Sequence, residues 1–510
     1  MNTLTPETYR KKVLGTWLGK TVGGTLGAPW EGSTGPHTLT FYNPVPTGMM
    51  PNDDLDLQVV WACRLASDWN GVVSLSNFAD AWLQNIEFPC DEYGVVLRNL
   101  KRGIPPPFTG QIDNWFTDGL GGAIRSEIWA VLAPGDPHKA AAFAGLDASL
   151  DHAGNGIWAE QFLAALESAA FIENDIHTLI ETGLSVIPVN SEIARSIRDT
   201  MSWCDEALPF LEIRRRILAH HGNANFTDVK MNLAFETAAL LLGKGDFAAS
   251  ICTAVNFGQD ADCTGATVGA ILGLIAPDRI PETWLAPIGR SLVLNEGING
   301  IKPPPTLDAF TDLLIGLRDR VSIRKEDLAE PTPMPDSFRY AIHARSTVLR
   351  PFFANDFRKL GIESLPETSA CAEIVRLSGN VTEITFEGLP EDALQLLEID
   401  FTLDVPETVR ILVCSPANVL VWIDGIFRFS REGGPMIPAF HRAPANTRVD
   451  LALTLGLHTL TIGLAPLTED MHTAPLVFGL ADTRNHWLPQ SVFCDKPFVT
   501  PPVILPHSHV

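Results

Sequence analysis

Residues 256–276 read NFGQDADCTGATVGAILGLIA. The second half of this stretch is a run of small and apolar residues, too rich in Gly and Ala for a surface helix, so it predicts a buried one. Two carboxylates, Asp260 and Asp262, stand just before that run. Burying carboxylates is costly unless a cation or the N–H groups of a helix N-terminus compensate them. The stretch therefore predicts a buried helix that begins at an acidic site.

A second acidic segment lies much earlier, where residues 52–56 read NDDLD and an apolar stripe at helical spacing follows. One Asn or Asp is enough to cap a helix N-terminus. The further acids leave two readings open for this segment, capping alone or metal binding. Considered together, the two acidic segments suggest one shared site for a hard divalent cation.

Glycines recur at every fourth position in the first thirty residues, at Gly15, Gly19, Gly23 and Gly27. This spacing leaves one face of a helix without side chains and predicts very close packing against another helix. Pro29 is expected to end the helix and place Glu31 on a loop, where by itself it reads as a solvated carboxylate.

The chain is too long for a single hydrophobic core, since it has 510 residues. Its composition, 45% hydrophobic and 19% charged, is that of a globular protein. Residues 1–325 read almost entirely as helices. Residues 326–337, EDLAEPTPMPDS, are typical of a linker. Short strand-like runs with turns fill residues 338–510, including a hairpin signal at Asp424-Gly425, and predict an all-β sandwich.

The net charge of −23 argues against a nucleic-acid backbone or an anionic membrane as the main partner. We find no apolar run long enough for a membrane span and no signal-peptide pattern at the N-terminus. Eight cysteines without a CxxC pair are typical of buried thiols in a reducing compartment. A cytoplasmic location is expected.

Two loop regions are candidates for contact with a ligand. Residues 94–125 contain a Pro-Pro-Pro run and a glycine cluster that includes Gly122, a pattern that suits either a ligand-facing loop or a plain connection. Residues 151–156, DHAGNG, separate two predicted helices and contain His152 and Asn155. A histidine at such a break is more often a loop hydrogen-bonder than a catalyst. Asn232 and Glu236 lie four residues apart on a later helix, and an exposed face is one reading that stays open for them.

Three blocks of the sequence resemble the ADP-ribosylglycohydrolases, a family that includes the dinitrogenase reductase-activating glycohydrolases. The blocks are GGTLGAPWE (23–31), NDD (52–54) and GQDADCTGATVGA (258–270), and the resemblance covers roughly residues 8–300. It implies an all-α orthogonal bundle around a divalent-metal site, with Mg²⁺ or Mn²⁺ as one or two ions. The expected fold is thus an orthogonal helical bundle followed by a β-sandwich.

The resemblance also implies roles for single residues. Glu31 falls at the position of an acidic residue near the scissile bond, and either Glu31 or Asp54 would accept a proton from water. Gly122, His152 and Asn155 fall near the substrate. The metal-ligand positions are Asn52, Asp53, Asp54, Asp260, Asp262 and Cys263.

Three residues depart from the family pattern. Asn52 and Cys263 stand where the family has Thr, and Gly24 stands where Asp is common. A thiol is a poor ligand for hard cations, so Cys263 leaves the number and identity of the metals open.

The activity that this resemblance implies is metal-dependent hydrolysis of an N-ribosidic bond, with ADP-ribosyl-arginine as the family's best-known type of substrate. A free nucleoside or small N-riboside is an alternative substrate, and an inactive structural or binding relative is an alternative of another class. The β-sandwich resembles accessory domains of sugar-acting hydrolases. In it, Trp422 and His441 either face a ligand or belong to the packing, and oligomerisation through this domain is open.

Overall fold

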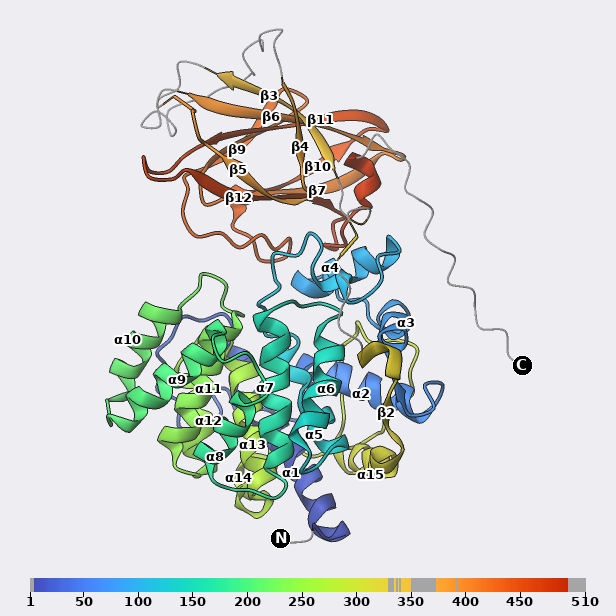
Figure 1. Cartoon of the computed structure of the whole chain (residues 1–510), viewed down its shortest axis with the longest axis vertical. Helices are drawn as coiled ribbons and strands as arrows, with labels where there is room; N and C mark the ends of the chain where they lie inside the picture. The colour runs from blue at the N-terminus through green and yellow to red at the C-terminus, as the bar shows by residue number, and fades with distance from the viewer. Residues whose placement is uncertain are drawn as a thin grey trace, which may run out of the picture. The chain divides into compact units, whose positions relative to one another are not determined.

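The computed structural model describes residues 4–328, 334–335, 338, 341–349, 373–390 and 393–493. The chain divides into two compact units (Figure 1). One consists of Met1–Glu87 and Phe116–Pro331, and the other of Phe88–Trp115 and Thr332–Val510. Part of the predicted linker, residues 329–333 and 336–337, lies outside the described residues.

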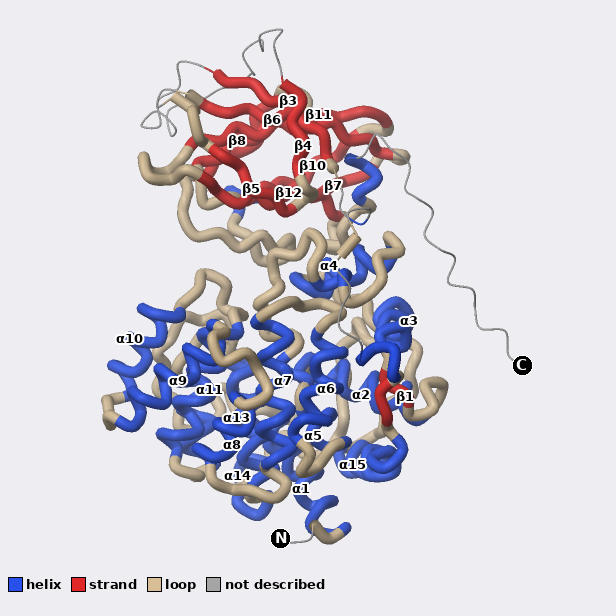
Figure 2. The backbone as a smooth tube through the Cα atoms, viewed as in Figure 1, coloured by secondary structure: helices blue, strands red, loops and turns tan. Residues whose placement is uncertain are grey.

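The first unit is helical, as the sequence predicts, and Figure 2 shows helices joined by loops as its main elements. Many of its helices begin at a Ser, Thr or Asp whose side chain accepts a backbone N–H of the first turn, as Thr5, Ser74 and Asp228 do. A short parallel pair, β1 (Val72–Val73) and β2 (Ser322–Ile323), accompanies them. The helices are α1 (Pro6–Gly27), α2 (Asp53–Ala66), α3 (Leu75–Asn85), α5 (Glu127–Leu132), α6 (Pro137–Ala148), α7 (Asn155–Ala169), α8 (Ile176–Leu184), α9 (Glu192–Asp205), α10 (Phe210–His221), α11 (Val229–Gly243), α12 (Phe247–Asn256), α13 (Ala261–Ile275), α14 (Glu282–Leu285) and α15 (Leu307–Leu317).

The centre of this unit is the contact between α1 and α13, where the predicted close packing is confirmed. A Cβ atom on Gly19 would lie 2.0 Å from the Gly269 carbonyl oxygen, and one on Gly23 would lie 1.9 Å from the Gly265 carbonyl oxygen. The glycines of α13 lie equally close to α1, since a Cβ on Gly269 would lie 2.2 Å from Gly19 O. Two glycine faces thus bring two helix backbones together with no side chain between them.

The second unit is a sandwich of two antiparallel sheets, with strand orders β10-β7-β12-β5 and β4-β3-β6-β11-β8-β9 (Figure 1). Alternate residues of β6 and β7, such as Ile399, Phe401 and Ile411, pack in the core between the sheets. The predicted β-sandwich is therefore confirmed. Its strands are β3 (Ile342–Leu349), β4 (Glu373–Leu377), β5 (Val381–Thr385), β6 (Leu394–Leu403), β7 (Glu407–Cys414), β8 (Asn418–Ile423), β9 (Ile426–Arg431), β10 (Arg448–Leu453), β11 (Gly456–Ala465) and β12 (Thr473–Ala481).

The predicted hairpin joins β8 to β9, and both Asp424 and Gly425 have positive φ angles, 52° and 73°. Trp422 of β8 is fully buried, in a cluster with Leu394, Leu396 and Leu420 that is separate from the core between the sheets. It therefore belongs to the packing of the sandwich.

Residues 88–115 interrupt the sequence of the helical unit, yet they pack on the sandwich. They contain α4 (Asp91–Lys101), so the expectation of irregular structure from residue 94 onward is wrong over this helix. The Arg442 guanidinium contacts the Asp91 carboxylate at 2.6 Å, and Arg98 lies 4.4 Å over the Trp487 ring. The sequence does not predict this insertion.

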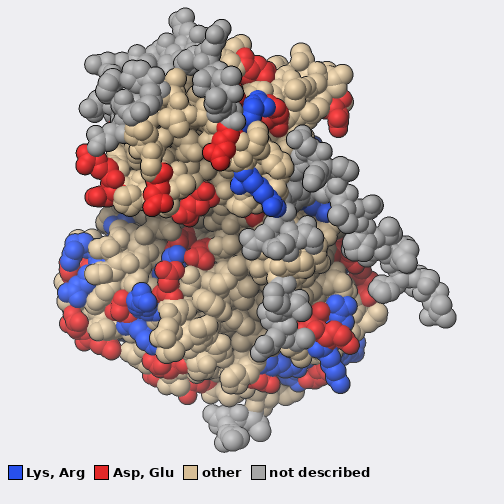
Figure 3. Space-filling model, turned by 45° about the horizontal axis from the view of Figure 1, so that its top comes forward, with Lys and Arg blue, Asp and Glu red and all other residues tan. Residues whose placement is uncertain are grey.

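The acidic excess is visible on the surface, where Asp and Glu are spread among Lys and Arg (Figure 3). Among the described residues, no helix is both long enough and apolar enough to cross a membrane.

Candidate functional site

The glycine contact between α1 and α13 sets the position of the candidate site. A Cβ on Gly27, the last residue of α1, would lie 2.2 Å from Ala261 O and 2.4 Å from Asp262 Cα. The end of α1 therefore touches the start of α13. Because Glu31 follows four residues after Gly27, the chain delivers it to the acidic start of α13.

Backbone hydrogen bonds fasten the Glu31 loop to the residues just before α13. Gly32 N donates to Gln259 O at 2.9 Å, and Gln259 N donates to Ser33 O at 2.6 Å. Gln259 adopts a φ of +68° to do so. Glu31 itself is exposed. Burial is the main cause that raises the pKa values of Asp260 and Asp262, and the negative charge of Glu31 adds to the shift of both groups.

The second acidic segment reaches the same place from α2. Asn52 caps this helix, with its Oδ1 accepting a hydrogen bond from Asp54 N at 2.8 Å. Gly24 leaves room for this amide, since a Cβ there would lie 2.1 Å from Asn52 Nδ2. The capping role predicted for this segment is confirmed. Asp53 is exposed, whereas Asp54 is fully buried.

Three buried side chains converge at the starts of α2 and α13. The ligand atoms of Asp54, Asp262 and Cys263 all lie within 4.8 Å of one another. Within the described part of the chain, no N–H or O–H group donates to either Asp54 oxygen or to Asp262 Oδ1. Two helix N-termini add positive potential, but they leave these oxygens without a direct partner. Buried, unpartnered carboxylates of this kind fit a divalent cation.

The electrostatics of the cluster support the same reading. Burial raises the pKa of Asp54 to about 7, although the nearby Lys20 ammonium opposes the shift. Burial and neighbouring carboxylates raise the pKa values of Asp260 and Asp262 well above the usual range. The Cys263 thiol has its pKa raised for the same two reasons. A bound cation would lower all of these pKa values, because it stabilises the ionised forms.

A buried ion pair between Lys20 and Glu127 is linked to Asp54 through Gln58. Lys20 Nζ, with none of the residue exposed, lies 2.7 Å from Glu127 Oε1. Gln58 Nε2 donates both to Glu127 Oε2 at 2.8 Å and to Asp54 O at 2.9 Å. Sequence reasoning missed these residues. The one signal in the sequence is Lys20 itself, because a charged residue within the tightly packed, glycine-spaced helix needs a buried partner.

Asn232 and Glu236 on α11 are also buried, with 0% and 2% of each residue exposed. The reading of these residues as an exposed face is therefore wrong. α11 is covered by neighbouring helices on this side, and Asp54, Asp260 and Lys20 all contribute to the electrostatics of Glu236. Its pKa is raised well above the usual range, mainly by burial.

The residues predicted near the substrate fall into two groups. Gly122 and His152 meet, since a Cβ on Gly122 would lie 3.2 Å from His152 Nδ1. The His152 ring is fully buried and its Nδ1 lies 2.9 Å from Asp151 Oδ1. Asn155 instead donates to Glu192 at 2.9 Å and to Asp118 at 3.2 Å. A substrate role for these residues stays a prediction.

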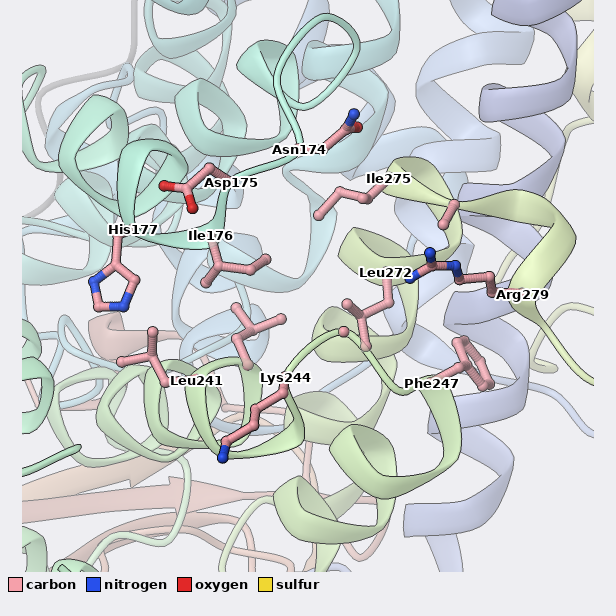
Figure 4. A pocket seen from close by; sticks show the side chains of 13 residues that line it. Asn174, Asp175, Ile176, His177, Leu241, Lys244, Phe247, Leu272, Ile275 and Arg279 are labelled. Carbon is pink, nitrogen blue, oxygen red and sulfur yellow. The ribbon is translucent and has the colours of Figure 1, made fainter. Parts of the chain in front are cut away.

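A cavity of about 500 Å³ lies at the opposite end of α13. Figure 4 shows Lys244 and Arg279 there among apolar side chains that include Leu272, Ile275 and Phe247. Since Asp260 and Asp262 stand at the start of α13 and the cavity at its end, the cavity is separate from the acidic site.

The helical unit is similar to a known protein family. The family model described as ADP-ribosylglycohydrolase matches residues 5–317, a range that contains all three sequence blocks, so the predicted resemblance is confirmed. One similar solved structure is titled an ADP-ribosylglycohydrolase-related protein complex; it is 20% identical, with 62% of this chain and 100% of that chain covered and a TM-score of 0.43. Among curated proteins, none matches the chain.

Proposed function

The chain belongs to the ADP-ribosylglycohydrolase family, and on that premise we propose that it hydrolyses the N-ribosidic bond of an ADP-ribosyl conjugate of the arginine type. A glycohydrolase function in general follows from the family. The observation that supports the finer proposal is the convergence of the buried Asp54 and Asp262 carboxylates at the start of α13, where the exposed Glu31 acts electrostatically on Asp262.

The residues present fit a divalent cation, which the family resemblance expects to be Mg²⁺ or Mn²⁺. Asp54, Asp262 and Cys263 would hold it, with Asp260 beside them. Asn52 and Asp53 remain predicted ligands. When bound, such a cation orients ribose hydroxyls and the attacking water and stabilises negative charge.

Glu31 is the residue best placed to act as the general base. It is exposed, whereas Asp54 is fully buried. In the proposed step a water oxygen forms a bond to the anomeric carbon and the carbon–nitrogen bond breaks. Glu31 takes the water proton, and the departing nitrogen takes a proton from solvent. Asp54 is then assigned to holding the cation.

The backbone around Glu31 contributes by fixing its position. The two hydrogen bonds between residues 32–33 and Gln259 hold the backbone next to Glu31 against the residue that precedes Asp260. Fixed placement of a base lowers the entropic part of the barrier.

Release of ADP-ribose from ADP-ribosyl-arginine, alongside a panel of free nucleosides, tests the proposal. We expect turnover of the arginine conjugate that depends on a divalent cation, and loss of turnover in Asp54→Asn and Asp262→Asn. Asp278→Asn is the matched control, since Asp278 lies on the surface beyond the far end of α13 and pairs with Lys11.

Each outcome of this assay has a clear reading. Turnover of nucleosides alone would show that the substrate is a free nucleoside and not an ADP-ribosyl conjugate. Absence of turnover on every substrate, together with retained cation binding, would indicate a binding relative and contradict the proposal. Unchanged rates in Asp54→Asn would contradict the site.

A further inference from the structure

We propose that Cys263 makes this centre selective for thiophilic divalent cations, such as Zn²⁺ and Co²⁺, over Mg²⁺. The inference rests on the proposed function only in that both place a cation at the start of α13. Its test needs no substrate, so it can fail or succeed independently of glycohydrolase activity.

The first observation is the donor set. Two carboxylates and one thiol share a space in which their ligand atoms lie within 4.8 Å of one another. An oxygen and a sulfur bound to one cation lie at most about 4.4 Å apart, since the two bonds are about 2.1 and 2.3 Å long. The cluster is therefore close to the size that one cation spans, and its sulfur is one of the three donors.

The second observation is that the carboxylates are ready to bind. Asp54 is 0% exposed and Asp262 is 7% exposed, and among the described residues no N–H or O–H group donates to either Asp54 oxygen. These side chains are aimed into the same space as the thiol. A cation bound between these carboxylates would therefore lie within reach of the sulfur.

The third observation is that the neighbouring hydroxyl does not substitute for the sulfur. Thr264 is fully buried, and its Oγ1 donates to Ala261 O at 3.3 Å, back into the first turn of α13. That hydrogen bond holds the Thr264 hydroxyl on its own helix. The third donor of the cluster is consequently sulfur rather than oxygen.

Ligand chemistry then decides the preference. Mg²⁺ requires oxygen donors and an almost ideal octahedron, whereas Zn²⁺ and Co²⁺ accept thiolate in small, irregular sets of ligands. Cation binding is an exchange: the Cys263 thiol loses its proton to solvent, and the sulfur forms a bond to the cation. Mn²⁺ is expected to lie between Mg²⁺ and Co²⁺ in affinity.

Cobalt titration of the purified full chain tests this directly. A sulfur-to-cobalt charge-transfer absorption is expected in the near ultraviolet for the natural protein, and Cys263→Thr and Cys263→Ser are expected to lack it. In parallel dialysis, the ratio of Zn²⁺ to Mg²⁺ affinity should fall by about 100-fold in Cys263→Thr. Proton release on Zn²⁺ binding should drop in the same variant.

Cys252→Ser is the matched control, because Cys252 is a buried thiol of the same unit that lies on α12 outside the cluster. It should keep the charge-transfer band. Circular dichroism of each variant checks that the helices are retained, and Cys263→Ser, the closest in size, serves if Cys263→Thr does not fold.

A charge-transfer band that is absent from the natural protein, or that survives in folded Cys263→Ser, would overturn the proposal. So would an unchanged Zn²⁺ to Mg²⁺ ratio. A cobalt–sulfur band in a protein that hydrolyses no ribosyl substrate would support this inference and contradict the proposed function.

Discussion

Replacing Gly19 by alanine tests how the fold builds its site. Ala is a better helix former than Gly by about 1 kcal/mol, so on a free helix the change would stabilise. Here the new Cβ would lie 2.0 Å from the Gly269 carbonyl oxygen, although ordinary van der Waals contact begins at 3.4 Å. The obstacle is backbone, which has no side-chain rotation to relieve the clash, so α1 and α13 must move apart.

Overpacking of this kind costs about 1–3 kcal/mol, and more when a helix must move. After the gain in helix propensity, we expect a net loss of about 2 kcal/mol or more in the free energy of unfolding. For a unit of this size that corresponds to a fall in Tm of roughly 5 °C. Because the same contact places Asp262 beside the end of α1, affinity for a divalent cation should fall as well.

The assay is thermal and denaturant unfolding followed by the far-ultraviolet dichroism of the helices, with cation affinity from calorimetry. Gly316→Ala is the control, since Gly316 lies in α15 and a Cβ there would meet nothing within 4 Å. That variant should be more stable by about 0.5–1 kcal/mol. If Gly19→Ala shifts stability in the same direction as Gly316→Ala, the reasoning is refuted.

Further predictions concern buried charges and thiols. Lys20→Met should lower the free energy of unfolding by about 3–5 kcal/mol, because it leaves Glu127 buried without its cation; Glu127→Gln added to it should restore part of the loss in denaturant unfolding. Glu236→Gln should leave the free energy of unfolding unchanged or raise it, because burial disfavours the ionised carboxylate and so raises the pKa of Glu236; a large loss in denaturant unfolding would contradict this. Burial raises the pKa of both Cys63 and Cys252 from 9.0 to about 11, so the folded state keeps protons that the unfolded chain loses. Stability should therefore fall as pH rises from about 9 to 11, and Cys252→Ala should reduce that slope in equilibrium unfolding.

Local sequence patterns predict the main helices, their close contact and the β-sandwich. The fourfold spacing of Gly15, Gly19 and Gly23 is a property of one helix, and it predicted close packing before the partner was known. Acidic residues before an apolar run predict the starts of α2 and α13, and this pattern is also local to each helix. Short β-rich runs separated by turns predict the sandwich.

Long-range partners were beyond the reach of such patterns. Lys20 pairs with Glu127 across 107 positions of sequence, and nothing near Lys20 marks that partner. Asp91 and Arg442 are 351 positions apart, so the insertion on the sandwich had no local signal. The burial of Glu236 has no local signal either, because it depends on the helices that cover α11.

Cation-dependent release of ADP-ribose from ADP-ribosyl-arginine tests the central claim most directly. Protein freed of metal by dialysis should be inactive, and its rate should rise in step with cation binding as the ion is titrated back. Glu31→Gln should bind the cation with near-normal affinity and release ADP-ribose slower by about 100-fold or more. Turnover by metal-free protein, or a Glu31→Gln variant as fast as the natural protein, would contradict the account.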